Sequence, residues 1–246
     1  MRFDIVTIFP EMVRSAATWG VVGRACQSGL IEVNAVDLRE FTHDRHRTTD
    51  DAPFGGGAGM VMTPGPIFEA VEHLSAQSAA KPRVVLTSPR GAVYNQRRAK
   101  ELAAQPHLVL LCGRYEGVDE RVREELVTDE ISIGDYVLTG GELAALVILD
   151  SVARLIPGVL GDEDSALHES FAEGLLEHPH YTRPAQFRGR SVPEVLLRGD
   201  HEAVRRWQRK EALRSTWLRR PELIARASLS PEDGRLLDEI RREMSA

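Results

Sequence analysis

The chain has 246 residues, of which 42% are hydrophobic and 28% charged, and its formal net charge is −6. This composition is ordinary for a globular protein and excludes a chain that is basic throughout. No apolar run approaches the roughly 20 residues of a membrane span, and residues 1–10 lack the layout of a secretory signal. The two cysteines, Cys26 and Cys112, are isolated, which favours a cytoplasmic location without disulfide or zinc framework.

Strand-like runs recur along the first half of the chain. They predict strands at Arg2–Phe9, Ile31–Asp37, Arg83–Thr87, Leu108–Cys112 and Glu130–Ile133. Helical segments alternate with them, at Gly20–Ser28, Asn95–Ala104, Glu116–Leu126 and Glu142–Ile156. This alternation predicts an α/β fold built on a parallel sheet.

Glycine turns follow three of the predicted strands, at Ser88–Gly91, at Gly113 and at Gly134 with Gly140-Gly141. Parallel sheets bind ligands outside the carboxyl ends of their strands, and glycine lets backbone groups approach a ligand closely. The sequence therefore predicts a ligand site at these turns, although ordinary tight turns have the same composition.

The segment Thr42–Pro66 is long, irregular and rich in glycine. Gly55–Gly59 lacks the spacing of a Walker A loop or a dinucleotide fingerprint, so a flexible or close-approach loop is favoured over a phosphate site. His43 and His46 have metal-like spacing, but without further ligands nearby they indicate a solvated polar loop.

The C-terminal part is expected to form a small helical domain at 169–246, joined to a domain at 1–158 by an acidic linker at 159–168. Its main helix is predicted at Asp200–Trp217. A last helix is predicted after Ser230, with Pro231 at N1 and Asp233 as the acid at N3.

Positive charge is concentrated between Arg183 and Arg226, where twelve Lys/Arg residues stand against five Asp/Glu, so that this stretch carries +7 and the rest of the chain −13. A polyanion-binding portion attached to an acidic body is one interpretation, and a solvated helix face is the other. The cations of the main helix are Arg205, Arg206, Arg209, Lys210 and Arg214.

Several segments together resemble the bacterial tRNA (guanine-N1)-methyltransferases of the SPOUT superfamily. They are Thr7–Pro10, Asp50–Gly57, Gly59–Met62, Leu111–Gly117, Ser132–Leu138 and His180–Pro184. The resemblance implies that the strands around Leu86, Leu111 and Ser132 form a trefoil knot. It also implies that the knot's loops bind S-adenosylmethionine, and that a homodimer places the active site between subunits. The implied cofactor residues are Leu86, Thr87, Ser88, Pro89, Arg90, Gly113, Tyr115, Glu116, Ile133, Gly134, Asp135, Tyr136, Val137, Leu138, Gly140 and Gly141.

In this family the methyl group goes to N1 of guanosine at tRNA position 37. N1 carries a proton, and a carboxylate is a suitable base. The family's Asp-Ser-Phe motif occurs here as Glu169-Ser170-Phe171, so Glu169 is the candidate base. Its side chain is one methylene longer than that of aspartate. The alternative interpretation is that Glu169 belongs to an acidic linker. Arg154 is the candidate to stabilise charge on guanine O6, or it pairs with Asp150 on the same helix.

The resemblance implies tRNA as the partner and a magnesium requirement that the residues themselves do not identify. Glu116 is a candidate for both cofactor and substrate binding, or a first-turn acid of a helix. The candidate substrate residues are Asp50, Glu116, Glu177, His180, Tyr181, Arg183, Arg205, Arg206, Arg209, Lys210 and Arg214. Two other functions stay open: a related knotted methyltransferase acting on a ribose 2′-hydroxyl or another base, and a non-catalytic RNA-binding protein.

Overall fold

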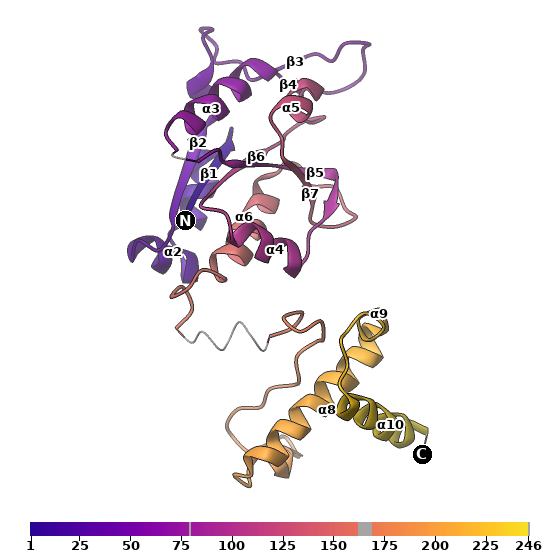
Figure 1. Cartoon of the computed structure of the whole chain (residues 1–246). Coiled ribbons are helices and arrows are strands. Elements are labelled where there is room, and N and C mark those ends of the chain that lie inside the picture. The colour runs from indigo at the N-terminus through magenta and orange to yellow at the C-terminus, as the bar shows by residue number, and fades with distance from the viewer. Residues whose placement is uncertain (79, 162–168, 246) are drawn as a thin grey trace. The chain divides into compact units, whose positions relative to one another are not determined.

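The computed structural model describes residues 1–78, 80–161 and 169–245, so the predicted linker 159–168 lies mostly outside the described residues (Figure 1). The chain divides into two compact units, Met1–Gly161 and Asp162–Ala246. Each unit has its own cluster of buried apolar side chains. Among the described residues, no helix has the length and apolar character needed to cross a membrane.

The N-terminal unit is built on a five-stranded sheet in which every pair of neighbouring strands is parallel. The strand order is β2-β1-β6-β5-β7. The bounds are β1 Arg2–Thr7, β2 Glu32–Asp37, β5 Arg83–Val93, β6 His107–Cys112 and β7 Asp129–Ser132. The predicted α/β class with a parallel central sheet is therefore confirmed.

Helices cover both faces of this sheet (Figure 1). They are α1 Pro10–Ala16, α2 Gly20–Gln27, α3 Pro64–Ala76, α4 Gln96–Ala103, α5 Glu120–Glu125 and α6 Glu142–Ala153, with a short 3₁₀ turn η1 at Leu38–Phe41. Alternate residues of β6 separate into two apolar clusters: Leu108 and Leu110 pack with α4 and α6, whereas Val109 and Leu111 pack with α3. The period of two along a strand thus produces two cores, one on each face.

Two helices differ from the sequence expectation, and both begin at a proline. Pro10 ends β1 in the prediction but is the first residue of α1, and Pro64 lies in the predicted irregular segment but begins α3. Proline suits the first turn of a helix because the missing N–H has no partner there in any case. A third difference is α5, which begins at Glu120 rather than Glu116, since the chain turns through Gly117 at φ +118°.

The prediction of a turn at Ser88–Gly91 is wrong, because these residues lie inside β5. The pairing of β5 with β7 shifts register between Thr87 and Ala92, so the segment bulges without leaving the strand. A Cβ on Gly91 would lie 2.3 Å from the backbone nitrogen of Ile131, so this glycine permits the close approach of β5 to β7. The irregular segment also contains a two-stranded pair, β3 Asp50–Asp51 with β4 Val61–Met62.

The described part of the C-terminal unit contains helices and one small hairpin. Its elements are β8 Gln186–Phe187, β9 Arg190–Ser191, the 3₁₀ turn η2 Glu194–Leu196, α8 His201–Arg219, α9 Pro221–Ile224 and α10 Pro231–Ser245. The predicted start of the last helix is confirmed, because Ser230 Oγ accepts from the N–H of Asp233 and the Asp233 carboxylate accepts from the N–H of Ser230. Leu213 of α8 packs against Leu236 and Ile240 of α10.

Candidate active site

A cavity of about 330 Å³ opens at the carboxyl ends of β5, β6 and β7. Its walls are the three chain segments that follow or interrupt these strands, together with the first turn of α6. The lining residues are Leu86, Thr87, Ser88, Pro89, Arg90, Gly113, Arg114, Tyr115, Glu116, Gly117, Val118, Glu120, Arg123, Glu130, Ile131, Ser132, Ile133, Gly134, Tyr136, Val137, Leu138, Thr139, Gly140, Gly141 and Ala144. The position is the one at which parallel sheets usually bind ligands.

Two adjacent glycines let the walls of this cavity meet. A Cβ on Gly141 would lie 2.1 Å from Thr87 Oγ1 and 2.9 Å from the Cα of Cys112, and the Gly141 N–H donates to the Gly113 carbonyl at 2.8 Å. A Cβ on Gly140 would lie 2.1 Å from Arg114 Nε. A side chain at Gly141 would press on backbone atoms, and one at Gly140 would displace the Arg114 side chain, so the close contact of the three segments depends on these glycines.

A buried charged network supports one wall of the cavity. The Glu142 side chain is 1% exposed, and both its oxygens accept from Arg114 Nε, at 3.0 and 3.2 Å. Thr7 Oγ1 donates to the same carboxylate at 2.7 Å, and Arg114 also donates to the Thr139 carbonyl at 3.2 Å. The Arg114 guanidinium lies 4.4 Å from the ring centre of Phe9. The network ties the Thr139–Gly141 turn to β1 and to the turn after β6.

Sequence reasoning missed Arg114 and Glu142. The signal was present, because a glutamate follows the two glycines at the start of an otherwise apolar helix, and a buried carboxylate needs a cation or several donors. The negative charge of Glu142 has a second effect. Burial raises the pKa of the Cys112 thiol well above its ordinary value and Glu142 raises this pKa further, so Cys112 stays protonated and unreactive.

The structure brings together the predicted cofactor residues in this one cavity, with the exception of Asp135, which is not among the lining residues. Leu86, Ile133 and Leu138 supply apolar surface, and the turns supply backbone donors and acceptors. The Tyr136 hydroxyl donates to the Ile133 carbonyl at 3.3 Å and closes the loop after β7. The lining residues that were not predicted lie mostly beside predicted ones, including Thr139, Ser132 and Gly117.

Asp50 and the glycine-rich segment lie beside the same wall. Burial raises the pKa of the Tyr115 hydroxyl, and the nearby negative charge of Asp50 raises it further. The N–H of Glu116 donates to the Met60 carbonyl at 3.0 Å, and a Cβ on Gly59 would lie 2.6 Å from Glu116 Oε1. The close-approach interpretation of the glycine segment therefore holds at Gly59. His43 is exposed and contacts Glu69, as expected for a polar loop.

The catalytic candidates lie one in each unit. Arg154 is the residue that ends α6 in the N-terminal unit. Glu169 belongs to the C-terminal unit, where its carbonyl accepts from the N–H of Ala172 at 3.1 Å. The next residue, Ser170, accepts from the N–H of Glu177 at 3.0 Å, so the segments that hold the two predicted glutamates lie side by side.

Three of the predicted substrate residues cluster against α8. The Glu177 carboxylate lies 2.8 Å from His180 Nε2. The centre of the Tyr181 ring lies 6.2 Å from the centre of the Trp207 ring. Arg183 is exposed in the segment that follows.

The cations of α8 divide into two groups. Arg206, Arg209, Lys210 and Arg214 form ion pairs with acids that lie mainly on α10, among them Glu239, Asp233 and Glu243. Arg205 is exposed, and within the described residues it forms no ion pair. The apparent cationic stripe is therefore largely neutralised by a second helix, and the role of the four paired cations in binding tRNA stays a prediction.

The fold and the cavity define an α/β protein with a cavity of the size of a small-molecule site at the ends of its central strands. Residues 1–226 match the family model described as tRNA (Guanine-1)-methyltransferase TrmD. The chain belongs to this family, which makes it a methyltransferase.

Similar proteins cover nearly the whole chain. The tRNA (guanine-N(1)-)-methyltransferase of Moorella thermoacetica is 58% identical over 243 residues, which are 98% of this chain and 97% of that protein. Proteins of the same name from Anoxybacillus flavithermus and Dictyoglomus turgidum are 52% and 54% identical, over 98% and 99% of this chain and 99% and 98% of their own lengths.

Proposed function

We propose that this chain transfers the methyl group of S-adenosylmethionine to N1 of the guanosine at position 37 of tRNA. The observation that carries the proposal is the cavity walled by three glycine-containing segments, in a chain that belongs to a tRNA methyltransferase family. Because the substrate is tRNA, the reaction belongs in the cytoplasm.

The cavity suits S-adenosylmethionine in size and chemistry. Its volume of about 330 Å³ lies within the usual range for small-molecule sites, roughly 300–1,000 Å³. Leu86, Ile133 and Leu138 offer an apolar slot for an adenine ring, and the backbone of the turns at Gly113 and Gly140-Gly141 offers polar groups for its edge and for the ribose. When bound, S-adenosylmethionine supplies a methyl group activated by the adjacent sulfonium charge.

Glu169 is the proposed general base. N1 of guanine carries a proton at neutral pH, and its lone pair accepts a methyl group only after that proton has left. A carboxylate within hydrogen-bond reach of N1–H removes the proton, a contribution of about 10²–10⁴ in rate. The hydrogen bond between Ser170 and the Glu177 backbone supports this role, because it orders the chain next to Glu169.

Arg154 is the proposed partner of guanine O6. Loss of the N1 proton spreads negative charge onto O6, and a guanidinium that meets this oxygen lowers the barrier. Its place at the end of α6 fixes its backbone, since the Arg154 N–H donates to the Asp150 carbonyl at 3.2 Å.

We infer that the segments around β5, β6 and β7 form a trefoil knot. The contacts that support it are those of the Thr139–Gly141 turn, which leaves the sheet at the edge strand β7 and returns to Gly113 and Thr87. The next helix, α6, packs against β6 and β1 rather than continuing beyond the edge. A return of the chain over strands already formed is what a trefoil knot requires, and these contacts support it.

A homodimer with the active site between subunits is also proposed. Its support is an exposed apolar surface on two adjacent helices of the N-terminal unit, α1 and α6, where Met12 is 37%, Leu143 51% and Val147 45% exposed. Leu143 and Val147 are four residues apart and share one helix face. Sedimentation tests the proposal: a dimer for the natural chain and a monomer for Val147→Glu are expected, and a monomeric natural chain excludes it.

The C-terminal unit is the proposed tRNA-binding domain, linked through residues 159–168. Arg183 and Arg205 have exposed guanidinium groups suited to phosphates, while Asp50, Glu116, Glu177, His180 and Tyr181 are proposed to contact the nucleotides near the target base. The magnesium requirement that the resemblance implies stays a prediction. Among the described residues, the group of three candidate ligands contains two imidazoles, whereas Mg²⁺ prefers oxygen ligands and usually keeps several waters beside one or two carboxylates. No step is assigned to that ion.

The test uses methyl-labelled S-adenosylmethionine and two tRNA transcripts that differ only in guanosine or adenosine at position 37. Label on guanine N1 in the first transcript, and none in the second, is expected. Label on a ribose indicates the alternative knotted methyltransferase, and absence of label with intact tRNA binding indicates a non-catalytic RNA-binding protein. Either result contradicts the proposal.

A further inference from the structure

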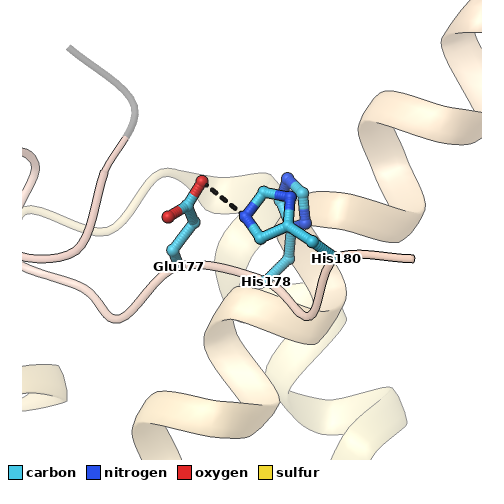
Figure 2. A group of neighbouring side chains, drawn as sticks. All are labelled: Glu177, His178 and His180. Carbon is cyan, nitrogen blue, oxygen red and sulfur yellow. Dashed lines mark ion pairs between the residues drawn. The ribbon is translucent and has the colours of Figure 1, made fainter. Parts of the chain in front are cut away.

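Two histidines and a glutamate cluster in the C-terminal unit, outside the cavity described above. One ligand atom from each of Glu177, His178 and His180 lies within 4.8 Å of the other two. Figure 2 shows the Glu177 carboxylate facing the His180 ring, with the His178 ring directly beside it. The two imidazole centres are 4.6 Å apart.

The backbone that carries these side chains is held in place. The N–H of Leu176 donates to Thr216 Oγ1 at 2.9 Å, and Thr216 is fully buried in α8. The N–H of Glu177 donates to Ser170 Oγ at 3.0 Å. The His178 ring lies 6.2 Å from that of Trp207, also on α8. The cluster therefore rests on a fixed support, as a binding site requires.

The hydrogen bonds of the two imidazoles leave suitable nitrogens for a cation. His178 Nδ1 lies 3.3 Å from the Pro179 carbonyl, and because a carbonyl only accepts, the tautomer that makes this hydrogen bond has Nδ1 as the donor and offers Nε2 to a cation. A ring nitrogen oriented by such a bond to a carbonyl is the usual arrangement at metal sites. His180 Nε2 lies 2.8 Å from Glu177 Oε1, and a metal ion bound by both atoms replaces this contact.

We propose that Glu177, His178 and His180 form a binding site for Zn²⁺ or a similar divalent transition metal. Two imidazoles and one carboxylate are a ligand set that zinc accepts, with water in the remaining position. In a tetrahedral zinc site with bonds of about 2.0–2.1 Å, ligand atoms are about 3.3 Å apart. The three ligand atoms now lie within 4.8 Å of one another, and bound zinc draws them closer together.

The site has a consequence for tRNA binding that rests on the proposed function. Glu177 and His180 are proposed tRNA contacts, so bound zinc occupies them and weakens tRNA binding. His178 has no assigned tRNA contact, which makes His178→Gln a means to remove the metal site while both proposed contacts stay in place.

The experiment titrates Zn²⁺ into the full chain after removal of metals by a chelator, with calorimetry as the readout and the visible absorption of Co²⁺ as a second probe. One zinc ion per chain is expected for the natural chain. His178→Gln and Glu177→Gln should lose at least about 10–100-fold in affinity, the loss that even outer ligand partners cause at metal sites. His46→Gln, an exposed histidine of the other unit, is the matched control and should bind zinc normally. Circular dichroism checks that each variant is folded.

Equal zinc affinity in the natural chain and in both cluster variants overturns the site, and so does a natural chain that takes up no zinc. The second measurement is tRNA affinity with and without zinc, in the natural chain and in His178→Gln. Zinc is expected to weaken tRNA binding by the natural chain and to leave tRNA binding by His178→Gln unchanged. Tight zinc binding without any effect on tRNA keeps the metal site and contradicts the tRNA roles of Glu177 and His180, so the two proposals fail separately.

Discussion

The cavity of the N-terminal unit and the charged helix of the C-terminal unit use their residues in opposite ways. The cavity depends on residues without side chains: Gly140 and Gly141 let three segments meet, and backbone groups face the ligand space. The helix α8 carries many long cationic side chains, most of which are bound to acids of the neighbouring helix. The glycine turns thus indicated the position of the cavity, whereas the run of cations did not indicate which of these side chains are free of ion pairs.

The largest effect is expected where a side chain is forced into the contact between segments. Gly141→Ala places a Cβ 2.1 Å from Thr87 Oγ1 and 2.9 Å from the Cα of Cys112, so the backbone must move. We expect a loss of about 1–3 kcal/mol in the free energy of unfolding, as for an overpacked core, and loss of S-adenosylmethionine binding. Urea unfolding and calorimetry measure the two effects. Gly65→Ala, whose Cβ meets nothing within 4 Å, is the control, and near-normal ligand affinity in Gly141→Ala contradicts the cavity assignment.

The next largest effect is expected on the rate of methyl transfer, with no change in S-adenosylmethionine affinity. Glu169→Gln keeps the size of the side chain and removes the base, so turnover should fall about 10²–10⁴-fold while S-adenosylmethionine affinity stays unchanged. Single-turnover methylation and calorimetry give the two values. The control is Glu173→Gln, four residues further along, which should keep near-normal turnover. If Glu169→Gln retains the natural rate, another group removes the N1 proton.

Two arginines of α8 test the division of its cations. Arg209 donates to Asp233, whose side chain is 3% exposed. Arg209→Gln should therefore lower the free energy of unfolding of the C-terminal unit by about 1–2 kcal/mol. Because Arg209 is itself partly exposed, this loss is smaller than the cost of breaking a fully buried pair. Arg205→Gln should leave stability unchanged and reduce the slope of log K for tRNA against log salt by about 0.7–0.9. Thermal unfolding and binding at several salt concentrations separate the two. The reverse pattern would show that the ion pairs of α8 do not decide which cations reach RNA.

The smallest effect is a dependence of the C-terminal unit on pH. Hydrogen bonds from Arg214 and Lys210 lower the pKa of Glu243 from its ordinary 4.5 to about 2. Because the folded pKa lies below the unfolded one, the stabilisation is complete above pH 4.5 and is lost as pH falls from 4.5 towards 2. Thermal unfolding followed by circular dichroism across this range should show the loss, and Glu243→Gln should reduce it. An unchanged pH profile in the variant would assign the acid sensitivity to other carboxylates, such as Asp233, whose pKa Arg209 lowers.

The sequence predicted much of the N-terminal unit because its signals are local. Five strand segments and their parallel arrangement followed from apolar runs that end at glycines, whereas the individual cavity residues were implied by the family resemblance. The starts of α1 and α3 were missed because proline both ends strands and begins helices, and the residues that follow decide which. The bulge of β5 was read as a turn, since a short stretch with Pro89 and Gly91 has the same composition in either case.

The residue sequence by itself determined the α/β class, the capped start of α10 and the glycine turns after β6 and β7, because each depends on the periodicity or backbone freedom of neighbouring residues. Only the tertiary structure decided that Arg114 and Glu142 meet at the cavity wall, that acids of α10 pair with four cations of α8, and that the His178 ring lies beside Trp207. The physical reason is that charge pairing and ligand clustering depend on distances through space. Residues far apart in the chain, such as Arg209 and Asp233, carry no local mark of their partner.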